Sequence, residues 1–240
     1  MIQFNIDQWR AWAPGIECPQ DWARWSLAPW IPAESEAQPD VTFLAALQRR
    51  RLSRLARMAF SVAWPLAEGQ PPQPLVFVSR HGETPRTFAI LGDLANREPL
   101  SPTQFSLSVH NAVIGLWSIL RGDTSEMTAL AGEGDGLEHG LLEAALLLAD
   151  GAPSVLLVVT EDSPPPAYAP WILDVPFPYA LALRLTTGRD WQLDLGQAEG
   201  EHPAAAEWPH ALSLLQLLAG PLTHCQHHWK QRLWTWQHHR

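Results

Sequence analysis

The sequence has little charge and little cysteine. Only 17% of its 240 residues are charged, while 46% are hydrophobic, which is a low charge content for a soluble domain. Its net charge of −9 argues against non-specific binding to nucleic acid, because that binding needs a basic surface. The two cysteines, Cys18 and Cys225, lie far apart and in no metal-binding or redox spacing. This usage fits a reducing compartment.

Long apolar runs and a leader sequence are also absent. The most apolar stretch, residues 141–159, is interrupted by Glu143 and Asp150, so we expect no membrane span. The first residues, MIQFNIDQWRAW, lack the basic start and the apolar stretch of a signal peptide. We therefore expect a cytoplasmic protein that has neither a membrane nor nucleic acid as a partner.

Tryptophan, in contrast, is abundant. The chain has 13 Trp, and five of them precede residue 40. Large aromatic side chains dominate both protein cores and protein interfaces. Two explanations therefore stand side by side, a Trp-rich core or a surface covered by another chain. Weak periodicity over residues 1–40 predicts an irregular arm packed through its indoles.

Apolar periodicity predicts alternating helices and strands along the rest of the chain. One helix is expected over residues 41–66 and is ended by Pro65. Strands are expected at residues 75–79, 155–159, 179–185 and 191–195, and further helices at residues 87–97, 211–218 and 224–236. The first helix contains a run of basic residues, namely Arg49, Arg50, Arg51, Arg54 and Arg57. Such a run is either a solvated helix face or a docking patch for an acidic partner.

A glycine-rich elbow, AGEGDG at residues 131–136, lies between a short apolar segment and a Leu/Ala-rich helix. Strand-to-helix elbows of this kind carry the nucleophile in several enzyme classes. This elbow contains no Ser, Cys or Thr. The sequence therefore predicts a catalytic position that holds no nucleophile.

Two segments that contain histidine suggest other chemistry. Arg80-His81-Gly82 resembles the signature of histidine phosphatases, in which the His takes the phosphoryl group and the Arg stabilises its charge. The second His of that family is missing, since the strand at residues 155–159 ends in Thr-Glu-Asp. The second group, His224, Cys225, His227 and His228, has ligand-like spacing. An amphipathic helix is the better interpretation of this group, and no metal site is expected.

A wider resemblance covers most of residues 1–185. The segments RRRLSRLARMA, VSRHGET, SPTQFSLSVHNAVIGLWSI, LLEAALLLADG and VLLVVTED resemble the N-terminal ketosynthase-like domain of partner subunits in bacterial aryl-polyene and related type II polyketide systems. The resemblance implies an α/β, thiolase-like fold with a mixed sheet covered by helices, truncated relative to a full ketosynthase. It implies one domain, with an arm at residues 1–40, a core at 41–185 and a shortened part at 186–240.

The same resemblance implies the loss of catalysis. Matching Asn111, Gly115 and Ile119 to the helix that precedes the nucleophile in active ketosynthases places Gly134 at the nucleophile position. The two histidine motifs that such enzymes need for condensation, His-Gly-Thr and Gly-His, are absent as well. These features imply a non-catalytic chain length factor that needs no cofactor, pairs with an active beta-ketoacyl synthase and shapes its acyl tunnel.

Partner contacts are implied by the family as well. The expected interface with the ketosynthase comprises Val109, His110, Asn111, Trp117, Met127, Thr128, Ala129 and Leu130. The basic run itself suggests a second contact, in which an acidic acyl carrier protein docks on Arg50, Arg54 and Arg57. Two alternatives remain, a histidine phosphatase that uses Arg80-His81-Gly82 and a stand-alone acyl-binding or scaffold protein.

Overall fold

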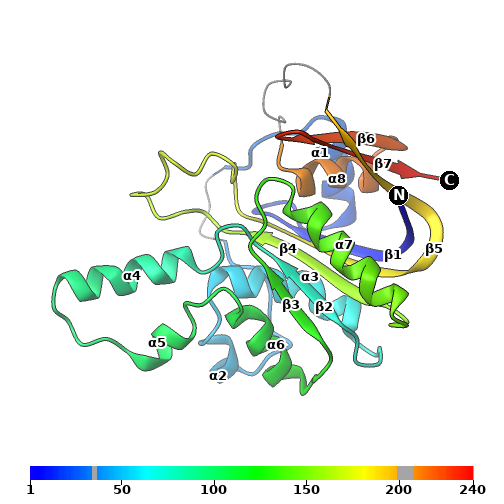
Figure 1. The fold of residues 1–240 in the computed structure, drawn as a ribbon. Coiled ribbons are helices and arrows are strands. Elements are labelled where there is room, and N and C mark those ends of the chain that lie inside the picture. The colour runs from blue at the N-terminus through cyan, green and yellow to red at the C-terminus, as the bar shows by residue number, and fades with distance from the viewer. Residues whose placement is uncertain (34–36, 199–207, 240) are drawn as a thin grey trace.

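A computed structural model describes residues 1–33, 37–198 and 208–239. It contains one seven-stranded mixed sheet with the order β3-β2-β4-β5-β7-β6, in which β1 also pairs with β5 (Figure 1). The strands are β1 (Ile2–Trp12), β2 (Leu75–Val78), β3 (Met127–Leu130), β4 (Val155–Glu161), β5 (Tyr179–Gln197), β6 (His224–Trp229) and β7 (Arg232–His238). The helices are α1 (Pro19–Leu27), α2 (Ala46–Arg49), α3 (Arg54–Ala67), α4 (Thr84–Ala95), α5 (Pro102–Ser106), α6 (Ala112–Arg121), α7 (Gly136–Ala149) and α8 (His210–Ala219).

The three strands at the β3 end of the sheet are parallel. β2 runs parallel to both β3 and β4, whereas β5 pairs with β4 in the antiparallel sense. The carboxyl ends of parallel strands meet at one edge of a sheet, where ligand sites of open α/β sheets occur. That edge here carries the start of the β2–α4 turn, the elbow between β3 and α7, and the end of β4.

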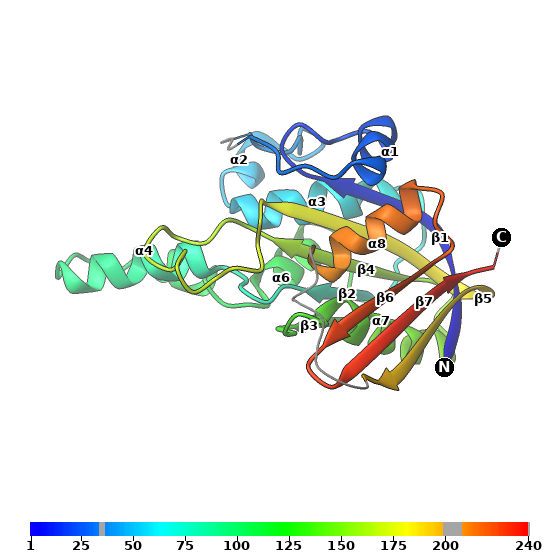
Figure 2. The ribbon, with the colours of Figure 1, turned by 90° about the horizontal axis from the view of Figure 1, so that it is seen from above.

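The two faces of the sheet carry separate cores, as the twofold alternation of side chains along a strand requires. Phe77 and Leu156 lie in one cluster with residues of α3 and α6. Val76 and Leu157 lie in the other cluster with residues of α7, α8 and α1. The view from above places α3 on one side of the sheet and α7 on the other (Figure 2). The predicted fold class, a mixed sheet covered by helices, is confirmed.

The tryptophans lie mainly in the core of this chain. Five of the largest fully buried side chains are Trp22, Trp25, Trp117, Trp234 and Trp236. The Trp-rich core is thus the explanation that the structure supports. The expectation of an irregular arm over residues 1–40 is wrong, because Ile2–Trp12 form β1 and pair with β5.

β5 replaces two predicted strands. Its first half pairs with β4 and its second half with β7, and β1 runs along both halves. Gly188 lies at the crossing of β1 and β5, where an ideal Cβ would be 1.9 Å from Oδ1 of Asn5. That oxygen accepts a hydrogen bond from the backbone N–H of Asp190. The close approach needs glycine, and β5 continues without a break between the two predicted strands.

The helix predicted over residues 41–66 is divided into two helices. α2 ends at Arg49, and α3 begins after Ser53, whose Oγ accepts a hydrogen bond from the backbone N–H of Ala56 at 3.0 Å. This cap separates the arginines, so they do not share one helix face. Pro65 lies inside α3, which runs on to Ala67.

Of the two helices predicted in the C-terminal region, the structure contains one. α8 confirms the helix expected at residues 211–218. Residues 224–236 form the β6–β7 hairpin instead of a helix. Its turn contains Lys230 at φ 55°, and Trp234 and Trp236 alternate inward from β7. The twofold alternation of these indoles is the stronger pattern, and the helical spacing of His224 and His228 is coincidental.

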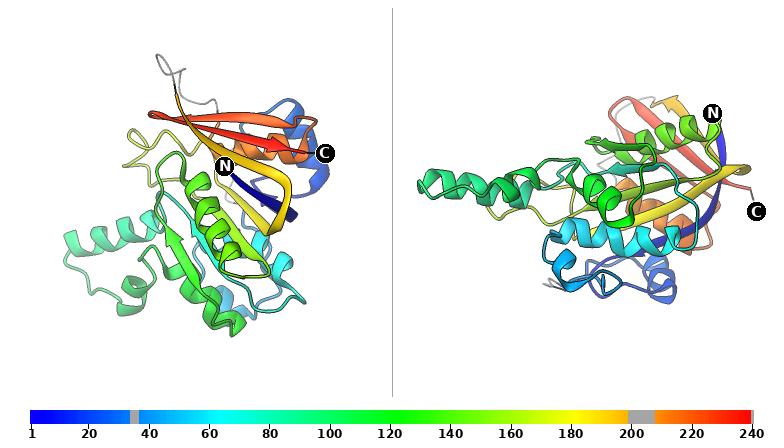
Figure 3. Two further views of the ribbon diagram at one scale, coloured as in Figure 1. Left: turned by 45° about the vertical axis from the view of Figure 1, so that its right-hand side comes forward. Right: turned by 90° about the horizontal axis from the view of Figure 1, so that it is seen from below.

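α4 and α5 extend away from the sheet as an arm (Figures 1 and 3). Neither helix has a buried residue, and both expose large apolar side chains, among them Phe88, Leu91, Leu94 and Phe105. Within the described ranges, no helix has both the length and the apolar character that a bilayer crossing requires. The arm thus presents an apolar surface that its own sheet does not cover.

Candidate functional site at the glycine-rich elbow

The elbow, residues 131–136, connects Leu130, the last residue of β3, to Gly136, the first residue of α7. It is tightly wound, because an ideal Cβ on Gly132 would lie only 2.5 Å from Cα of Gly136. α7 also packs closely on the sheet, since a Cβ on Gly140 would meet Val78 at 2.5 Å. Glycine therefore allows both the sharp turn and the tight contact of the helix with the strands.

Gly134, the predicted position of the lost nucleophile, faces an indole. An ideal Cβ at this residue would lie 2.2 Å from Cε3 and Cζ3 of Trp229 on β6. Nε1 of Trp229 donates a hydrogen bond to Oε2 of Glu133 at 3.0 Å, and Lys230 pairs with the same oxygen at 2.5 Å. Trp229 is thereby held where a side chain on Gly134 would begin.

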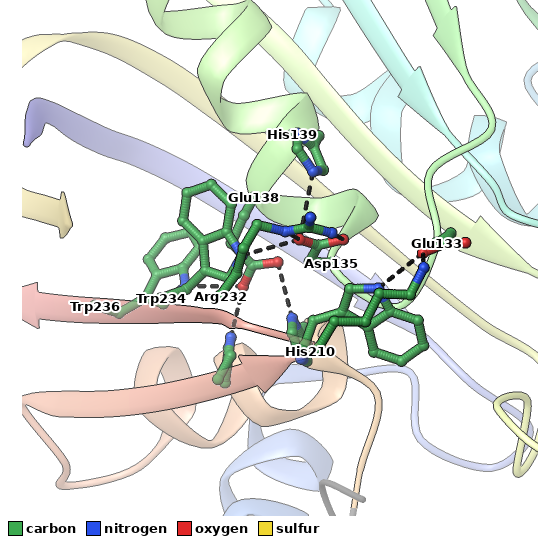
Figure 4. A network of polar contacts seen from close by, with 11 residues as sticks. Glu133, Asp135, Glu138, His139, His210, Arg232, Trp234 and Trp236 are labelled. Atoms are coloured by element: carbon green, nitrogen blue, oxygen red, sulfur yellow. Dashed lines mark hydrogen bonds and ion pairs between the residues drawn. The ribbon is translucent and has the colours of Figure 1, made fainter. Parts of the chain in front are cut away.

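Asp135 ties the elbow to the β6–β7 hairpin (Figure 4). Its carboxylate is only 1% exposed and accepts two hydrogen bonds from Arg232, from Nε at 2.5 Å and from Nη2 at 3.1 Å. Nε1 of Trp234 donates a third at 3.1 Å, and His139 lies 3.4 Å away. A paired, many-donor carboxylate of this kind fixes the start of α7 against the hairpin.

Glu138, one turn further along α7, is the centre of a second network (Figure 4). Its oxygens lie 2.9 Å from Nδ1 of His210 and 2.6 Å from Nδ1 of His227, and Nε1 of Trp236 donates to it at 3.1 Å. Burial by itself would raise the pKa of Glu138, but the hydrogen bonds from the two histidines hold this pKa below its ordinary value. For His227, burial lowers the pKa. The two imidazole rings stack 4.4 Å apart.

Glu138, His210 and His227 also offer ligand types that bind zinc. Their nearest oxygen and nitrogen atoms lie within 4.8 Å of one another. The N···O separations of 2.6 and 2.9 Å are hydrogen-bond distances, shorter than the roughly 3.3 Å between neighbouring ligands of a tetrahedral zinc ion with bonds of about 2 Å. The arrangement is that of a hydrogen-bonded network. Sequence reasoning missed it because it placed His227 on a helix.

A pocket of about 360 Å³ lies beside the elbow. It is lined by Gly134, Trp229 and His210, by the ends of β2 and β4, and by residues of the loop that leads into β5. A larger cavity of about 610 Å³ lies between β1 and α3. We assign the candidate site to the smaller pocket, because it adjoins the elbow and contains a buried histidine that Glu138 orients.

Glu161, at the end of β4, organises the turn that follows β2. It accepts hydrogen bonds from Oγ of Ser79 at 3.2 Å and from the backbone N–H groups of Arg80 and His81. Burial raises the pKa of Glu161 to about 7. Asp174 then holds both side chains of the Arg80–His81 pair, at 2.9 and 3.0 Å. These contacts give the Arg-His-Gly segment a structural role.

Comparisons with known proteins decide the family. A family model described as "Beta-ketoacyl synthase, N-terminal domain" matches residues 22–237. The chain belongs to the beta-ketoacyl synthase N-terminal domain family. No curated protein sequence matches this chain.

Solved structures of ketosynthases share the fold. One match is a chain from the complex of the ketosynthase ApeO with its chain length factor ApeC from Xenorhabdus doucetiae. It is 28% identical with a TM-score of 0.88, and the match covers 99% of this chain and 100% of that one. The ishigamide ketosynthase/chain length factor is 13% identical with a TM-score of 0.63, covering 82% and 68%. A type II polyketide ketosynthase in complex with its acyl-carrier protein, AntDE:AntF, is 12% identical with a TM-score of 0.54, covering 78% and 64%.

The expected partner-interface residues fall into three places on this ketosynthase-like fold. Val109 and Asn111 are exposed between α5 and α6, and Nε2 of the neighbouring His110 is 2.7 Å from the carbonyl oxygen of Ser79. β3, with Met127, Thr128, Ala129 and Leu130, forms one end of the strand order.

Trp117 does not fit the predicted interface. It is 1% exposed and packs edge-on against Phe60 and Trp64 in the core of this chain. Its inclusion is corrected, since it lies on the inner face of α6.

The three predicted carrier-docking arginines are not equivalent. Arg50 is exposed in the segment between α2 and α3. Arg54 is largely buried and pairs with Asp162 at 3.5 Å, and Nη2 of Arg57 donates to the carbonyl oxygen of Arg49 at 2.7 Å. Arg54 therefore has a structural partner within the chain, whereas Arg50 is open to solvent.

Proposed function

We propose that this chain is a catalytically silent chain length factor. It would pair with an active beta-ketoacyl synthase and shape the acyl tunnel of that enzyme during aryl-polyene or polyketide-type chain elongation. The observation that carries the proposal is the contact between Gly134 and Trp229, because it leaves neither a nucleophile nor room for one. A ketosynthase needs that nucleophile to hold the growing acyl chain.

Two histidines do converge beside the elbow, as they would in a condensing enzyme. Both direct Nδ1 toward Glu138. Histidines that activate a substrate carboxylate must aim a ring nitrogen at the reacting group. With Gly134 in place of the nucleophile, they have no acyl group bound nearby to act upon, so a structural or ligand-binding role suits them better.

The partner is proposed from the relative with the higher identity and from exposed apolar surface. The chain with 28% identity comes from a complex of a ketosynthase with its chain length factor. The free edge of β3 and the apolar arm of α4 and α5 are surfaces that a monomer would need to cover. We place the ketosynthase on β3, on Val109–Asn111 and on this arm.

The alternatives have less support. A histidine phosphatase would need His81 free to attack phosphate, but its Nε2 lies 3.0 Å from Asp174. An acyl-binding protein that acts without a partner would leave the edge of β3 and the apolar side chains of α4 and α5 exposed. Both alternatives remain distinguishable by experiment.

The test is co-expression with a candidate ketosynthase, purification through a tag on one chain, and an elongation assay with malonyl-loaded acyl carrier protein. We expect a one-to-one complex that elongates only when both chains are present. If the ketosynthase is fully active alone and the chains migrate independently, the proposal fails. Phosphatase activity that is lost in His81→Ala would favour the first alternative.

A further inference from the structure

The pocket beside the elbow has predominantly apolar walls. Val78, Leu137 and Val159 line its inner side, and the indoles of Trp171, Trp208 and Trp229 line it as well. Its volume of about 360 Å³ lies at the small end of the range for small-molecule sites. Indole faces favour offset stacking on flat π systems. The walls therefore suit a small, flat, apolar molecule.

One buried polar group in this wall is oriented toward a ligand. His210 is 4% exposed, and its Nδ1 is 2.9 Å from Glu138. The fully buried Glu138 remains ionised, since its hydrogen bonds hold its pKa low, so it accepts the Nδ1–H of His210 and fixes the tautomer. In the neutral ring, Nε2 is then a hydrogen-bond acceptor.

Nε2 of His210 has no other use within the part of the chain that the structure describes. None of those residues forms a hydrogen bond with it. His210 is one of the residues that line the pocket. A carboxylate-oriented imidazole with its second nitrogen open is a recognition group.

The charged groups that line this pocket already have partners, and Glu161 accepts its hydrogen bonds from Ser79 and from the backbone N–H groups of Arg80 and His81. Arg80 binds Asp174 at 2.9 Å, and Lys230 binds Glu133 at 2.5 Å. A charged ligand would have to break one of these pairs or remain unpaired, which is costly in an apolar pocket. The occupant should therefore be uncharged.

We propose that the pocket beside the elbow binds a flat, uncharged apolar molecule with one hydroxyl group, which donates a hydrogen bond to Nε2 of His210. The three indoles hold the apolar body, and His210 selects the hydroxyl. This binding needs only residues of this chain. It is therefore independent of the proposed chain length factor role, and either can fail without the other.

The experiment measures binding of two matched probes to the full chain by isothermal titration calorimetry, with the ketosynthase present when the two copurify. 2-Naphthol can donate a hydrogen bond, whereas 2-methoxynaphthalene has nearly the same shape and cannot. We expect 2-naphthol to bind about tenfold more tightly. Failure of both probes to bind, or equal affinities for the two, would overturn the proposal.

Two variants localise the site. His210→Asn keeps an N–H donor for Glu138 but has no acceptor atom at the position of Nε2. The affinity for 2-naphthol should therefore fall to that for 2-methoxynaphthalene, and the affinity for 2-methoxynaphthalene should stay unchanged. Trp171→Ala alters a side chain that is 77% exposed and should weaken both probes about fivefold by loss of stacking. Wild-type affinities in Trp171→Ala would contradict the assignment even if His210→Asn does not fold.

A direct readout on the unmodified chain completes the test. The ¹⁵N resonance of Nε2 of His210 should shift on addition of 2-naphthol and not on addition of 2-methoxynaphthalene. An unshifted resonance with bound 2-naphthol would place that ligand elsewhere.

Discussion

The indole of Trp229 occupies the space next to Gly134 that a side chain would need, with an ideal Cβ only 2.2 Å from two ring carbons. The two residues are distant in the sequence, since Gly134 lies in the elbow before α7 and Trp229 is the last residue of β6. The space beside Gly134 is thus filled by a residue of the β6–β7 hairpin. Any side chain larger than glycine at residue 134 would have to displace this indole.

Gly134→Ala should destabilise the chain because the new methyl group must displace Trp229. We expect a loss of about 1–3 kcal/mol in the free energy of unfolding, as for other overpacked sites. Trp229→Ala removes the obstacle, so Gly134→Ala should cost much less in that background. A double-mutant cycle from urea denaturation measures this coupling. Additive effects would mean that the two residues do not compete for space.

The pair of Asp135 and Arg232 should contribute to stability far more than an exposed pair does. Arg232→Met leaves the buried carboxylate short of two donors and should cost about 2 kcal/mol. Arg24→Met is the matched control, because Arg24 pairs with Asp21 on the surface at 2.5 Å with 74% of its side chain exposed. That change should cost far less, because the pair is exposed to solvent. Equal losses of unfolding free energy for the two variants in urea denaturation would contradict a larger contribution from the buried pair.

Glu161 should make stability fall as the pH rises through the weakly acidic range. Burial raises its pKa from 4.5 to about 7, so the folded chain holds a proton that the unfolded chain releases. The contribution is complete below pH 4.5, declines up to about pH 7 and is then gone. It amounts to at most about 3 kcal/mol.

Glu161→Gln tests this pH dependence. The lowered pKa of His227 acts in the opposite direction, since stability from that residue is lost as the pH falls. Both proteins share that effect, so the difference between their unfolding free energies isolates Glu161. The unfolding free energy of the wild type minus that of the variant should therefore fall from pH 4.5 to 7. A constant difference across this range would show that Glu161 titrates normally.

The sequence predicted the centre of the fold because its patterns there are local. The short apolar strands β2 and β4, the elbow and the apolar face of α7 each show their character within a few residues. The assignment of Gly134 to the nucleophile position rests on matching one preceding helix and stays a prediction. The alternation of Ile2, Phe4 and Ile6 was a usable signal for β1, but the many indoles nearby obscured it.

The polar networks could not be predicted in the same way, because they join distant parts of the chain. His210 and His227 lie 72 and 89 residues from Glu138. The signal that was available is Glu138 itself, an acidic residue in an otherwise apolar stretch of α7. A buried carboxylate needs donors, but nothing local says which histidines supply them.

Carrier docking should depend on Arg50 rather than on Arg54. Arg50→Glu combined with Arg51→Glu changes two exposed side chains and should raise the KM for acyl carrier protein about tenfold, with little change in kcat, because the partner is acidic. Arg54 is left intact because its pairing with Asp162 would confuse a docking effect with a folding effect. Arg189→Glu, also exposed, is the control. Unchanged kinetics in the double variant would exclude this patch.

Assembly with the ketosynthase should be sensitive to charge at Val109. This residue is 43% exposed beside α6, so Val109→Arg should leave the fold intact while burying an unpaired charge in the proposed interface. Such a charge typically costs several kcal/mol, enough to abolish copurification. Leu195→Arg is the matched control, since Leu195 is 53% exposed on β5, away from β3. Copurification that survives Val109→Arg but is lost in Leu195→Arg would move the interface to the β5 side of the sheet.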